Sequence, residues 1–331
     1  MIVSKTPLRI SFVGGGTDLP SFYRSNSYGA VVSASVNSYV YVSIKSHSEI
    51  FQEKIRLNYY DSEVVDKVSD IKNTIIREAL KLTGIEERIY IATVSDVPAS
   101  TGLGSSSTFA VGLLNALYRY KGMRVSRGQL AEEASHIEID ILKSPIGKQD
   151  QYAAAFGGLN YIKFNKDDTV SINPIHLSAD QHEELFRSMI SFWTGVTRSA
   201  DSILSEQEKK NTSDVNIRSL IAMRDQADLV KDTMNTENFD IQTFGKLIHE
   251  GWTMKKSLAS KISNNSIDKF YEEAMNKGAF GGKISGAGGG GFLNLFADTK
   301  YQEAISNSMV NLGLMPCNFK LDTEGTTVYE I

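Results

Sequence analysis

Residues Pro98–Ser107 read PASTGLGSSS, a stretch in which nearly every side chain is small. The stretch lies between two apolar runs, IYIATV (89–94) and residues 108–120, which predict a strand and a buried helix. Small side chains let successive backbone N–H groups point at phosphate oxygens, and the positive end of the following helix adds to the attraction. A flexible linker would instead lie between polar segments. The stretch therefore predicts an anion-binding loop at the start of a helix.

Two further glycine clusters flank this loop in the sequence. FVGGGTD (12–18) follows a short apolar run and ends in a carboxylate, so it is either a tight turn capped by Asp18 or a wall from which Asp18 reaches a hydroxylated ligand. KISGAGGGGF (283–292) contains the spacing GxGxxG, but FLNLF follows, which is a strand pattern. Because a dinucleotide-binding loop must open a helix, the spacing does not indicate dinucleotide binding here.

Composition limits the class of protein. The chain has 331 residues with 41% hydrophobic and 22% charged, enough for two domains, and its net charge of −4 gives no basic field for nucleic acid or anionic lipid. Cys317 is the only cysteine, which excludes an internal disulfide and favours a reducing compartment. The N-terminal MIVSKTPLRI is too polar for a signal peptide, and no stretch reaches the roughly 20 apolar residues of a membrane span. We therefore expect a cytoplasmic protein with neither nucleic acid nor membrane as a partner.

Hydrophobic periodicity predicts strands and helices in both halves, hence an α+β fold with two domains, 1–168 and 169–331, divided at a polar KDDT turn. Ser126 is expected to cap its helix, with Gln129 completing a capping box. The expected strands are 30–44 (or a hairpin there), 55–60, 89–94 and 159–164, with short strands near 284, 292–296, 319 and 328, and the expected helices are 71–82, 108–120, 126–142, 199–209, 215–234, 239–261 and 266–276.

Two carboxylates have unusual settings. Glu138 lies in SHIEIDIL (135–142), where it is either a solvated charge on a helix face or a functional group. Asp150 lies in a polar turn that enters an Ala-rich, apolar helix. A charged side chain next to buried structure needs an ion-pair partner or a function to offset the cost of its burial. A role as the N-cap of the helix would also explain this aspartate.

The motifs PLRISFVGGGTD, PASTGLGSSS and KISGAGGGGF, in this order, resemble the signature of the GHMP kinases, and the resemblance spans residues 7–292. Within that superfamily, VGGGTDLP, IGKQDQYAAAFGG and WTGVTRSA are most similar to D-glycero-D-manno-heptose 7-phosphate kinases. The resemblance implies the two-domain GHMP kinase fold. An N-terminal domain like ribosomal protein S5 domain 2 and a C-terminal ferredoxin-like domain would enclose the active site in the cleft between them.

The resemblance also implies roles for individual residues. Asp150 matches the general base and Arg9 a basic residue that stabilises developing charge, while Ser106 and Glu138 match the groups that hold Mg²⁺. The loop around the ATP phosphates would comprise Pro98, Ser100, Thr101, Gly102, Leu103, Gly104, Ser105, Ser106 and Ser107. The sugar phosphate would contact Gly15, Gly16, Thr17, Asp18, Gly286, Gly288 and Gly289, with Lys148 and Arg198 as candidates for its remote phosphate.

The reaction implied by the resemblance is transfer of phosphate from ATP to the anomeric (C1) hydroxyl of heptose 7-phosphate, giving the 1,7-bisphosphate, a step in GDP-heptose biosynthesis for surface polysaccharide. Two alternative functions stay open: a sugar 1-kinase for galactose, fucose or an N-acetylhexosamine, and a catalytically silent sugar and ATP sensor. A homodimeric assembly also stays open. A glycosidase that uses Glu138 and Asp150 would leave three phosphate-type loops unexplained.

Overall fold

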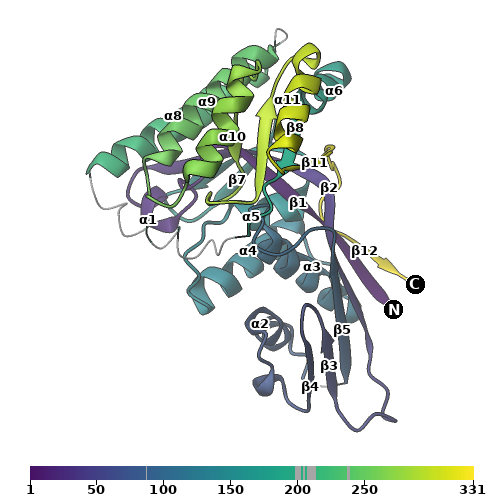
Figure 1. Ribbon diagram of the computed structural model, residues 1–331. Coiled ribbons are helices and arrows are strands. Elements are labelled where there is room, and N and C mark those ends of the chain that lie inside the picture. Colours follow the sequence, from purple (N-terminus) through teal and green to yellow (C-terminus); the bar gives the residue numbers. More distant parts are fainter. Residues whose placement is uncertain (87, 198–202, 204–205, 207–213, 237–238) are drawn as a thin grey trace.

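The first sheet is built around two long N-terminal strands. The computed structural model describes residues 1–86, 88–197, 203, 206, 214–236 and 239–331. Within these residues the sheet has eight strands in the order β12-β1-β2-β5-β3-β4, with β6 beside β2 and β7 beside β6 (Figure 1). The strands are β1 (Ile2–Val13), β2 (Tyr28–Ser46), β3 (Ile55–Asn58), β4 (Ser62–Val65), β5 (Ile89–Ser95), β6 (Leu159–Asn165), β7 (Val170–Pro174) and β12 (Thr327–Glu330).

The predicted strand at 30–44 is one continuous strand, β2, and not a hairpin. Its length lets it pair with three neighbours, with β1 along one edge and with β6 and then β5 along the other. The register against β1 shifts between Pro7 and Leu8. Proline lacks the N–H that a regular ladder needs, so a register shift at this position is expected.

Helices of the first half pack on this sheet. The largest contact is made by α3 (Ser105–Tyr120) against β1 and β2, with α5 (Gln149–Phe156) alongside, and most residues of both helices are buried. The other helices are α1 (Pro20–Tyr23), α2 (Thr74–Thr83) and α4 (Arg127–Ser135), with a 3₁₀ turn η1 (Val68–Asp70) and a π-helical turn η2 (His136–Ile141). Ser126 caps α4 as predicted, and the helical segment predicted over 126–142 is confirmed in extent, although its last part, after Ser135, is the π-helical turn η2.

The second sheet belongs to the C-terminal half and is antiparallel, with the order β11-β8-β10-β9. Its strands are β8 (Met189–Trp193), β9 (Gly281–Ile284), β10 (Phe292–Phe296) and β11 (Met315–Cys317), accompanied by α6 (Ala179–Ser188), α8 (Asp214–Met234), α9 (Ile241–Lys256), α10 (Asn265–Asn276) and α11 (Thr299–Asn311). The strand predicted near residue 319 is wrong, because β11 ends at Cys317. The helix predicted at 199–209 lies almost wholly outside the described residues.

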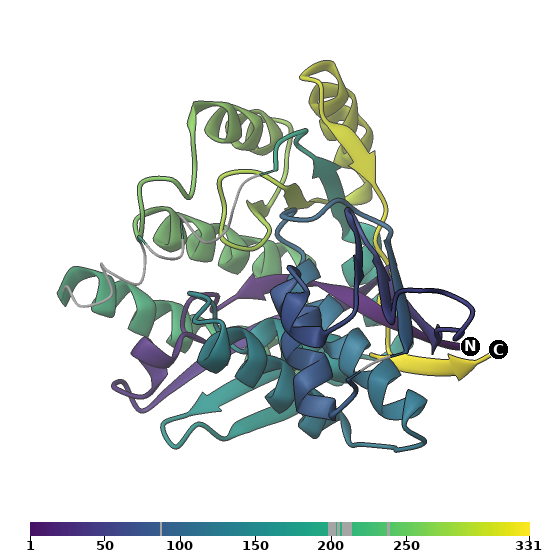
Figure 2. The same ribbon diagram turned by 90° about the horizontal axis from the view of Figure 1, so that it is seen from below.

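The two halves are joined by more than their linker. The ring of Phe12, at the end of β1, packs edge-on against Phe244 of α9 and Phe296 of β10, at centroid distances of 5.5 and 6.0 Å. The last strand, β12, returns to pair with β1, and the two chain ends lie side by side (Figure 2). Because β7 also joins the first sheet, that sheet takes strands from both sides of residue 168. The domain boundary at residue 168 stays a prediction.

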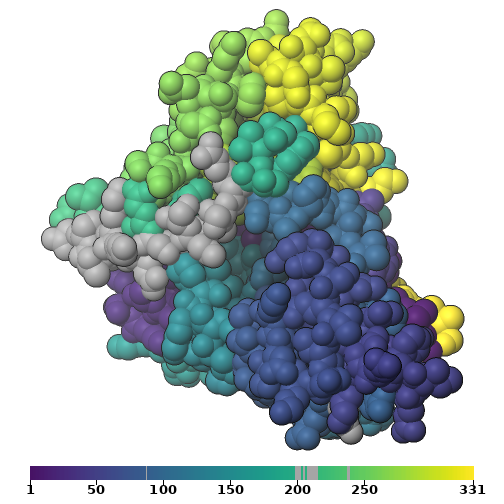
Figure 3. Space-filling view, turned by 60° about the horizontal axis from the view of Figure 1, so that its bottom comes forward, coloured from purple at the N-terminus to yellow at the C-terminus, as the bar shows by residue number. Residues whose placement is uncertain are grey.

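The surface shows the same division between the halves. In the space-filling view, the green and yellow C-terminal residues gather above the purple and blue N-terminal residues (Figure 3). Among the described residues, no helix is both long enough and apolar enough to cross a membrane.

The packing of α3 on the first sheet predicts a large effect of truncation at Leu114, which is fully buried. We expect Leu114→Ala to lower the free energy of unfolding by about 2–5 kcal/mol, because it removes apolar contacts and leaves a cavity. Leu229→Ala on α8, where the side chain is 52% exposed, should change it by less than about 0.5 kcal/mol. Urea unfolding followed by circular dichroism measures both, and equal losses would contradict the packing described for α3.

Candidate active site

A cavity of about 500 Å³ lies where the three glycine-rich segments meet. It is bounded by the ends of β1, α3 and α5 from the first half and by α9 and the loop before β10 from the second half. Of the residues predicted from the sequence, those lining it are Arg9, Gly16, Asp18, Ser100, Gly102, Gly104, Ser105, Ser106, Ser107, Glu138, Asp150 and Gly286. The cavity therefore brings together residues that are up to 277 positions apart, from 9 to 286.

An ion pair between Arg9 and Asp150 forms the centre of the cavity wall. Arg9 donates from Nε to Asp150 Oδ1 at 2.7 Å, and its Nη2 lies 2.6 Å from the same oxygen. Nη1 donates to the carbonyl of Gly102 at 2.7 Å. The arginine side chain is 4% exposed and the aspartate side chain 22%, so the carboxylate is the member that faces the cavity. Asp150 is the second residue of α5, whose N-cap is Lys148, so the N-cap explanation of Asp150 is wrong.

Two helices that begin at the cavity, α3 and α5, lack the side-chain caps found on other helices. Gly104 precedes α3 with φ of +78°, and no side chain caps the first turn of α3 or of α5. Side-chain caps are present on α2, α4, α6, α9, α10 and α11, where Asn73, Ser126, Ser178, Asp240, Asn264 and Asp298 accept hydrogen bonds from the first turn. The uncapped N–H groups and positive helix end of α3 match the predicted anion-binding loop.

The second and third glycine loops pack against each other without room for side chains. A Cβ on Gly102 would lie 2.4 Å from the carbonyl oxygen of Ser285, and one on Gly286 would lie 2.6 Å from the Cα of Gly102. At Gly291, with φ of +95°, a Cβ would lie 2.2 Å from the carbonyl oxygen of Thr101. Glycine is therefore required here both by the backbone conformation and by the close approach of the two halves.

Glu138 is buried at the end of the cavity next to α3. It is 2% exposed, so its interpretation as a solvated helix charge is wrong. The π-helical turn carries it, and its carboxylate accepts from Ser106 Oγ at 2.6 Å and from Gln151 Nε2 at 2.7 Å. Burial raises the pKa of this carboxyl above its usual value, and the hydroxyl and amide donors oppose that rise. A π-helical turn widens the helix by one residue, which is a common feature of functional sites.

Ser106 and Glu138 have the oxygen donors that Mg²⁺ prefers. Among the described residues there is no cluster of three or more His, Cys, Asp or Glu side chains able to hold a metal. Mg²⁺ usually takes one or two protein ligands and completes its shell with water and substrate phosphate oxygens, so the small donor set fits this ion and excludes a cage made only of protein side chains here. Ser106 and Glu138 therefore remain the predicted metal ligands.

The first glycine loop combines both interpretations that the sequence left open. Asp18 accepts from the N–H of Gly16 at 2.9 Å, as a turn cap, and it also lines the cavity. Burial and the nearby Asp150 raise the pKa of the Asp18 carboxyl, while the backbone donors lower it. Thr17 is fully buried, and its hydroxyl donates to the carbonyls of Gly14 and Ala30, so it holds the loop rather than lining the cavity.

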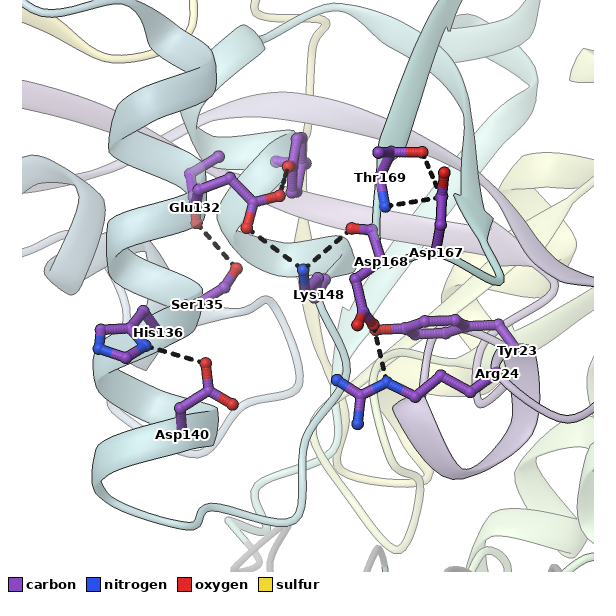
Figure 4. A network of polar contacts seen from close by, with 12 residues as sticks. Tyr23, Arg24, Glu132, Ser135, His136, Asp140, Lys148, Asp167, Asp168 and Thr169 are labelled. Carbon is purple, nitrogen blue, oxygen red and sulfur yellow. Dashed lines mark hydrogen bonds and ion pairs between the residues drawn. The ribbon is translucent and has the colours of Figure 1, made fainter.

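The two residues predicted to bind a remote phosphate are Lys148 and Arg198. Lys148 donates to Glu132 at 3.2 Å and to the carbonyl of Asp168 at 3.3 Å, within a network that also contains Tyr23 and Arg24 (Figure 4). Its ammonium is thus directed to the turn between β6 and β7 and does not line the cavity. Arg198 lies outside the described residues.

The remaining predicted residues support the loops from behind. Thr101 and Leu103 are fully buried, and the carbonyl of Leu103 accepts from the N–H of Arg9 at 3.1 Å. The outlying predicted residues, which do not line this cavity, are Pro98, Gly15, Gly288 and Gly289. Gly15 nevertheless faces it, because a Cβ there would lie 3.3 Å from Nζ of Lys255.

Among the residues lining the cavity, Lys255 is the charged side chain that sequence reasoning missed. It lies on α9, is 5% exposed and donates to the carbonyl of Gly286 at 2.7 Å. The sequence contains a signal for it, because the buried stripe of α9 runs through Phe244, Ile248 and Trp252 and reaches Lys255 three residues later, still on the same helix face. A lysine in an apolar stripe is buried at a cost, so it needs a partner or a function.

Comparison with protein families gives two matches along the chain. Residues 69–158 match the model of the GHMP kinases N terminal domain, and residues 231–313 match the model described as GHMP kinases C terminal. Both matched segments contribute to the cavity, the first through the loop at 98–107 and Asp150, and the second through Lys255 and Gly286.

Individual relatives agree over the full length. The chain is 29% identical to a D-glycero-alpha-D-manno-heptose 7-phosphate kinase of Campylobacter jejuni, covering 100% of this chain and 99% of the relative. It is 23% identical to a galactokinase of Pyrococcus furiosus, covering 96% and 95%. A crystal structure described as a D-glycero-D-manno-heptose 1-phosphate kinase from Bacteroides thetaiotaomicron is 25% identical, with a TM-score of 0.81 over 100% of this chain and 99% of that one. These matches confirm the α+β fold predicted from the sequence, which the structure shows to contain two sheets.

The contact between Thr101 and Gly291 predicts that a single methyl group there disrupts the junction of the two loops. We expect Gly291→Ala to lower the free energy of unfolding by more than about 1 kcal/mol, since it adds a steric clash to the strain of a positive φ. Gly313→Ala is the matched control, because Gly313 has φ of +89° but no atom lies within 4 Å of the place where its added methyl group would be. Thermal unfolding of both variants separates the two effects, and equal losses would contradict a tight junction.

Proposed function

Because the chain belongs to the GHMP kinase family, we propose that it is an ATP-dependent sugar kinase that phosphorylates the anomeric hydroxyl of D-glycero-D-manno-heptose 7-phosphate. The product is the 1,7-bisphosphate, within GDP-heptose biosynthesis for surface polysaccharide. The observation that carries the proposal is the Arg9–Asp150 pair, which faces the same cavity as the uncapped start of α3. The full-length similarity to a heptose 7-phosphate kinase supports the choice of sugar.

The loop at 98–107 and the first turn of α3 bind the phosphates of ATP. The N–H groups of Ser105, Ser106 and Ser107 have no side-chain cap and point toward the cavity end of the helix, where the helix dipole favours an anion. No Walker-type lysine is required, because backbone donors supply the positive field. Phosphoryl transfer depends mainly on positioning and on neutralising charge, so a preorganised loop supplies much of what the reaction needs.

Asp150 orients the attacking hydroxyl and accepts its proton. Its Oδ1 is held by Arg9, whereas Oδ2 lies beside Gly104, 3.0 Å from the position of an added Cβ. This second oxygen is the one directed to the side where α3 would hold the γ-phosphate. An anomeric hydroxyl is more acidic than an ordinary sugar hydroxyl, which makes the work of the base easier. Arg9 holds the carboxylate in place and offsets negative charge that develops during transfer.

Ser106 and Glu138 would hold Mg²⁺ next to the phosphates. When bound, the ion neutralises charge on the phosphate oxygens. The carboxylate is already fixed for this task by Ser106 and Gln151, and its burial excludes competing water. The donor set is complete only with phosphate oxygens and water, so the ion would arrive together with the nucleotide.

A panel of acceptors tests the proposed function. With ATP and Mg²⁺, we expect ADP release with heptose 7-phosphate at a kcat/KM at least about 10-fold above that of unphosphorylated heptose, galactose, fucose or N-acetylhexosamine, because one tenfold step needs only about 1.4 kcal/mol from remote phosphate contacts. The galactokinase similarity makes another sugar 1-kinase the second candidate. Equal turnover of galactose would favour that candidate, and no ADP release with any sugar would contradict a kinase.

The role of Asp150 gives a second test. We expect Asp150→Asn to lower kcat by about 10²–10⁴-fold, because the amide cannot accept the proton, while the Kd for ATP changes little. Asp140→Asn on η2 is a control, since its carboxylate is exposed and pairs with His136. Isothermal titration and a coupled ADP assay give the two quantities. Near-normal turnover of Asp150→Asn would remove this residue from the mechanism.

A further inference from the structure

Lys255 carries a positive charge into the cavity from the C-terminal half. It follows the apolar stripe of α9, so its stem is packed in the core while Nζ reaches the cavity wall. Its one acceptor among the described residues is the carbonyl of Gly286, at 2.7 Å. An ammonium has three donors, so two are available to a bound molecule. Nζ is also close to the first glycine loop, since a Cβ on Gly15 would lie 3.3 Å away.

Asp18 faces the same space with the opposite charge. It is 3% exposed and is held by two backbone donors, Gly16 N–H at 2.9 Å and Gln149 N–H at 3.4 Å. Among the described residues, no ion pair joins Asp18 to Lys255 or to another cation. A buried carboxylate and a buried ammonium therefore flank one cavity without direct contact, an arrangement that costs stability unless something between them satisfies both.

The hydrogen-bonding capacity of Asp18 and Lys255 indicates which ligand group fits between them. A hydroxyl can donate to a carboxylate and accept from an ammonium, so two adjacent hydroxyls satisfy both side chains. A phosphate between them would be opposed by Asp18 and by the neighbouring Asp150, both of which line the cavity. The pair is thus suited to a neutral polyol.

We propose that Lys255 is a specificity-determining residue that donates to one hydroxyl of the acceptor sugar while Asp18 accepts from the adjacent hydroxyl, so that the two side chains hold a vicinal diol beside the reacting oxygen. This inference rests on the proposed function, because it assigns the acceptor side of the same cavity. It also gives the C-terminal half a direct part in sugar binding, since α9 and the Gly286 loop are tied together through the Lys255 bond.

The charges around Lys255 add a pH dependence. Burial lowers its pKa to about 8, the carboxylates of Asp18 and Asp150 oppose this change, and Arg9 reinforces it. Lys283, buried on β9 and bonded to the carbonyl of Phe12, is the other lysine nearby. Because the ammonium donates best when charged, affinity for the acceptor should fall as pH rises from 7 to 9 through this pKa.

The experiment measures binding and turnover in Lys255→Met, Lys255→Arg and a matched control, Lys256→Met. Lys256 is the next residue of the same helix, and it pairs with Asp268 at 3.1 Å on a partly exposed face. Acceptor Kd is measured by isothermal titration without nucleotide, for heptose 7-phosphate and for unphosphorylated heptose. KM values for acceptor and ATP are measured at pH 7 and 9, and thermal unfolding checks that each variant is folded.

We expect Lys255→Met to raise the Kd and KM for the acceptor about 10- to 100-fold, as for loss of a hydrogen bond to a charged group, with the Kd for ATP changed less than about 3-fold. Both forms of heptose should be affected equally. Lys255→Arg should recover part of the affinity and show no fall between pH 7 and 9, because arginine stays charged. Lys256→Met should match the unmodified protein.

Three results would overturn the proposal. An unchanged acceptor Kd would remove Lys255 from the sugar site, and a loss confined to the phosphorylated heptose would make it a phosphate ligand. An equal loss of ATP affinity would make it only a support for the Gly286 loop. Absence of turnover in the unmodified protein would contradict the proposed kinase function. The role of Lys255 would still be tested in that case, because the acceptor Kd is measured without nucleotide.

Discussion

The part-buried ion pair of Arg9 and Asp150 is the constraint on which the rest of the site depends. Burying two charges is costly, and the cost is recovered only where the geometry and the remaining hydrogen bonds are good. Here one guanidinium holds the Asp150 carboxylate and the Gly102 carbonyl together. The strand β1, the second glycine loop and the start of α5 are therefore fixed relative to one another. In that arrangement Arg9 holds Oδ1 of the carboxylate, while Oδ2 lies beside Gly104.

Around this pair, several local interactions that usually stabilise a fold are missing, namely helix caps and hydrogen bonds to buried polar atoms. Other helices, such as α2, α4 and α6, have side-chain caps, whereas α3 and α5 begin at the cavity without one. Near the cavity, Ser11 Oγ, Thr101 Oγ1 and Gln149 Oε1 are buried with no hydrogen-bond partner among the described residues. Groups of this kind cost about 1–3 kcal/mol each. Their position beside the glycine loops is consistent with a site that is completed by its ligands.

The parts of the fold and site that depend on neighbouring residues in the sequence could be predicted. The small side chains of 98–107 and the following apolar run placed a loop and a helix correctly, and Ser126 caps α4 as its sequence indicates. Glu138 could not be placed by helical periodicity, because the chain changes to a π-helical turn that directs this carboxylate inward. Lys255 required knowledge that α9 packs beside the first loop, which is a contact between distant segments. The presence of Arg9 and Asp150 in one site, and the cleft between the two halves, could be expected only through the resemblance to a family.

The return of β12 to β1 affects how the chain is made. Residues 2–5 pair with residues 327–330, so a nascent chain leaves this edge of β1 open until residues 327–330 have been synthesised. An open edge can pair with a strand from another chain. A chain that stops before Thr327 would contain Arg9 and Asp150 but lack β12, so this edge of β1 would stay open to such pairing. The pairing of β12 with β1 thus removes an open strand edge at which chains could aggregate.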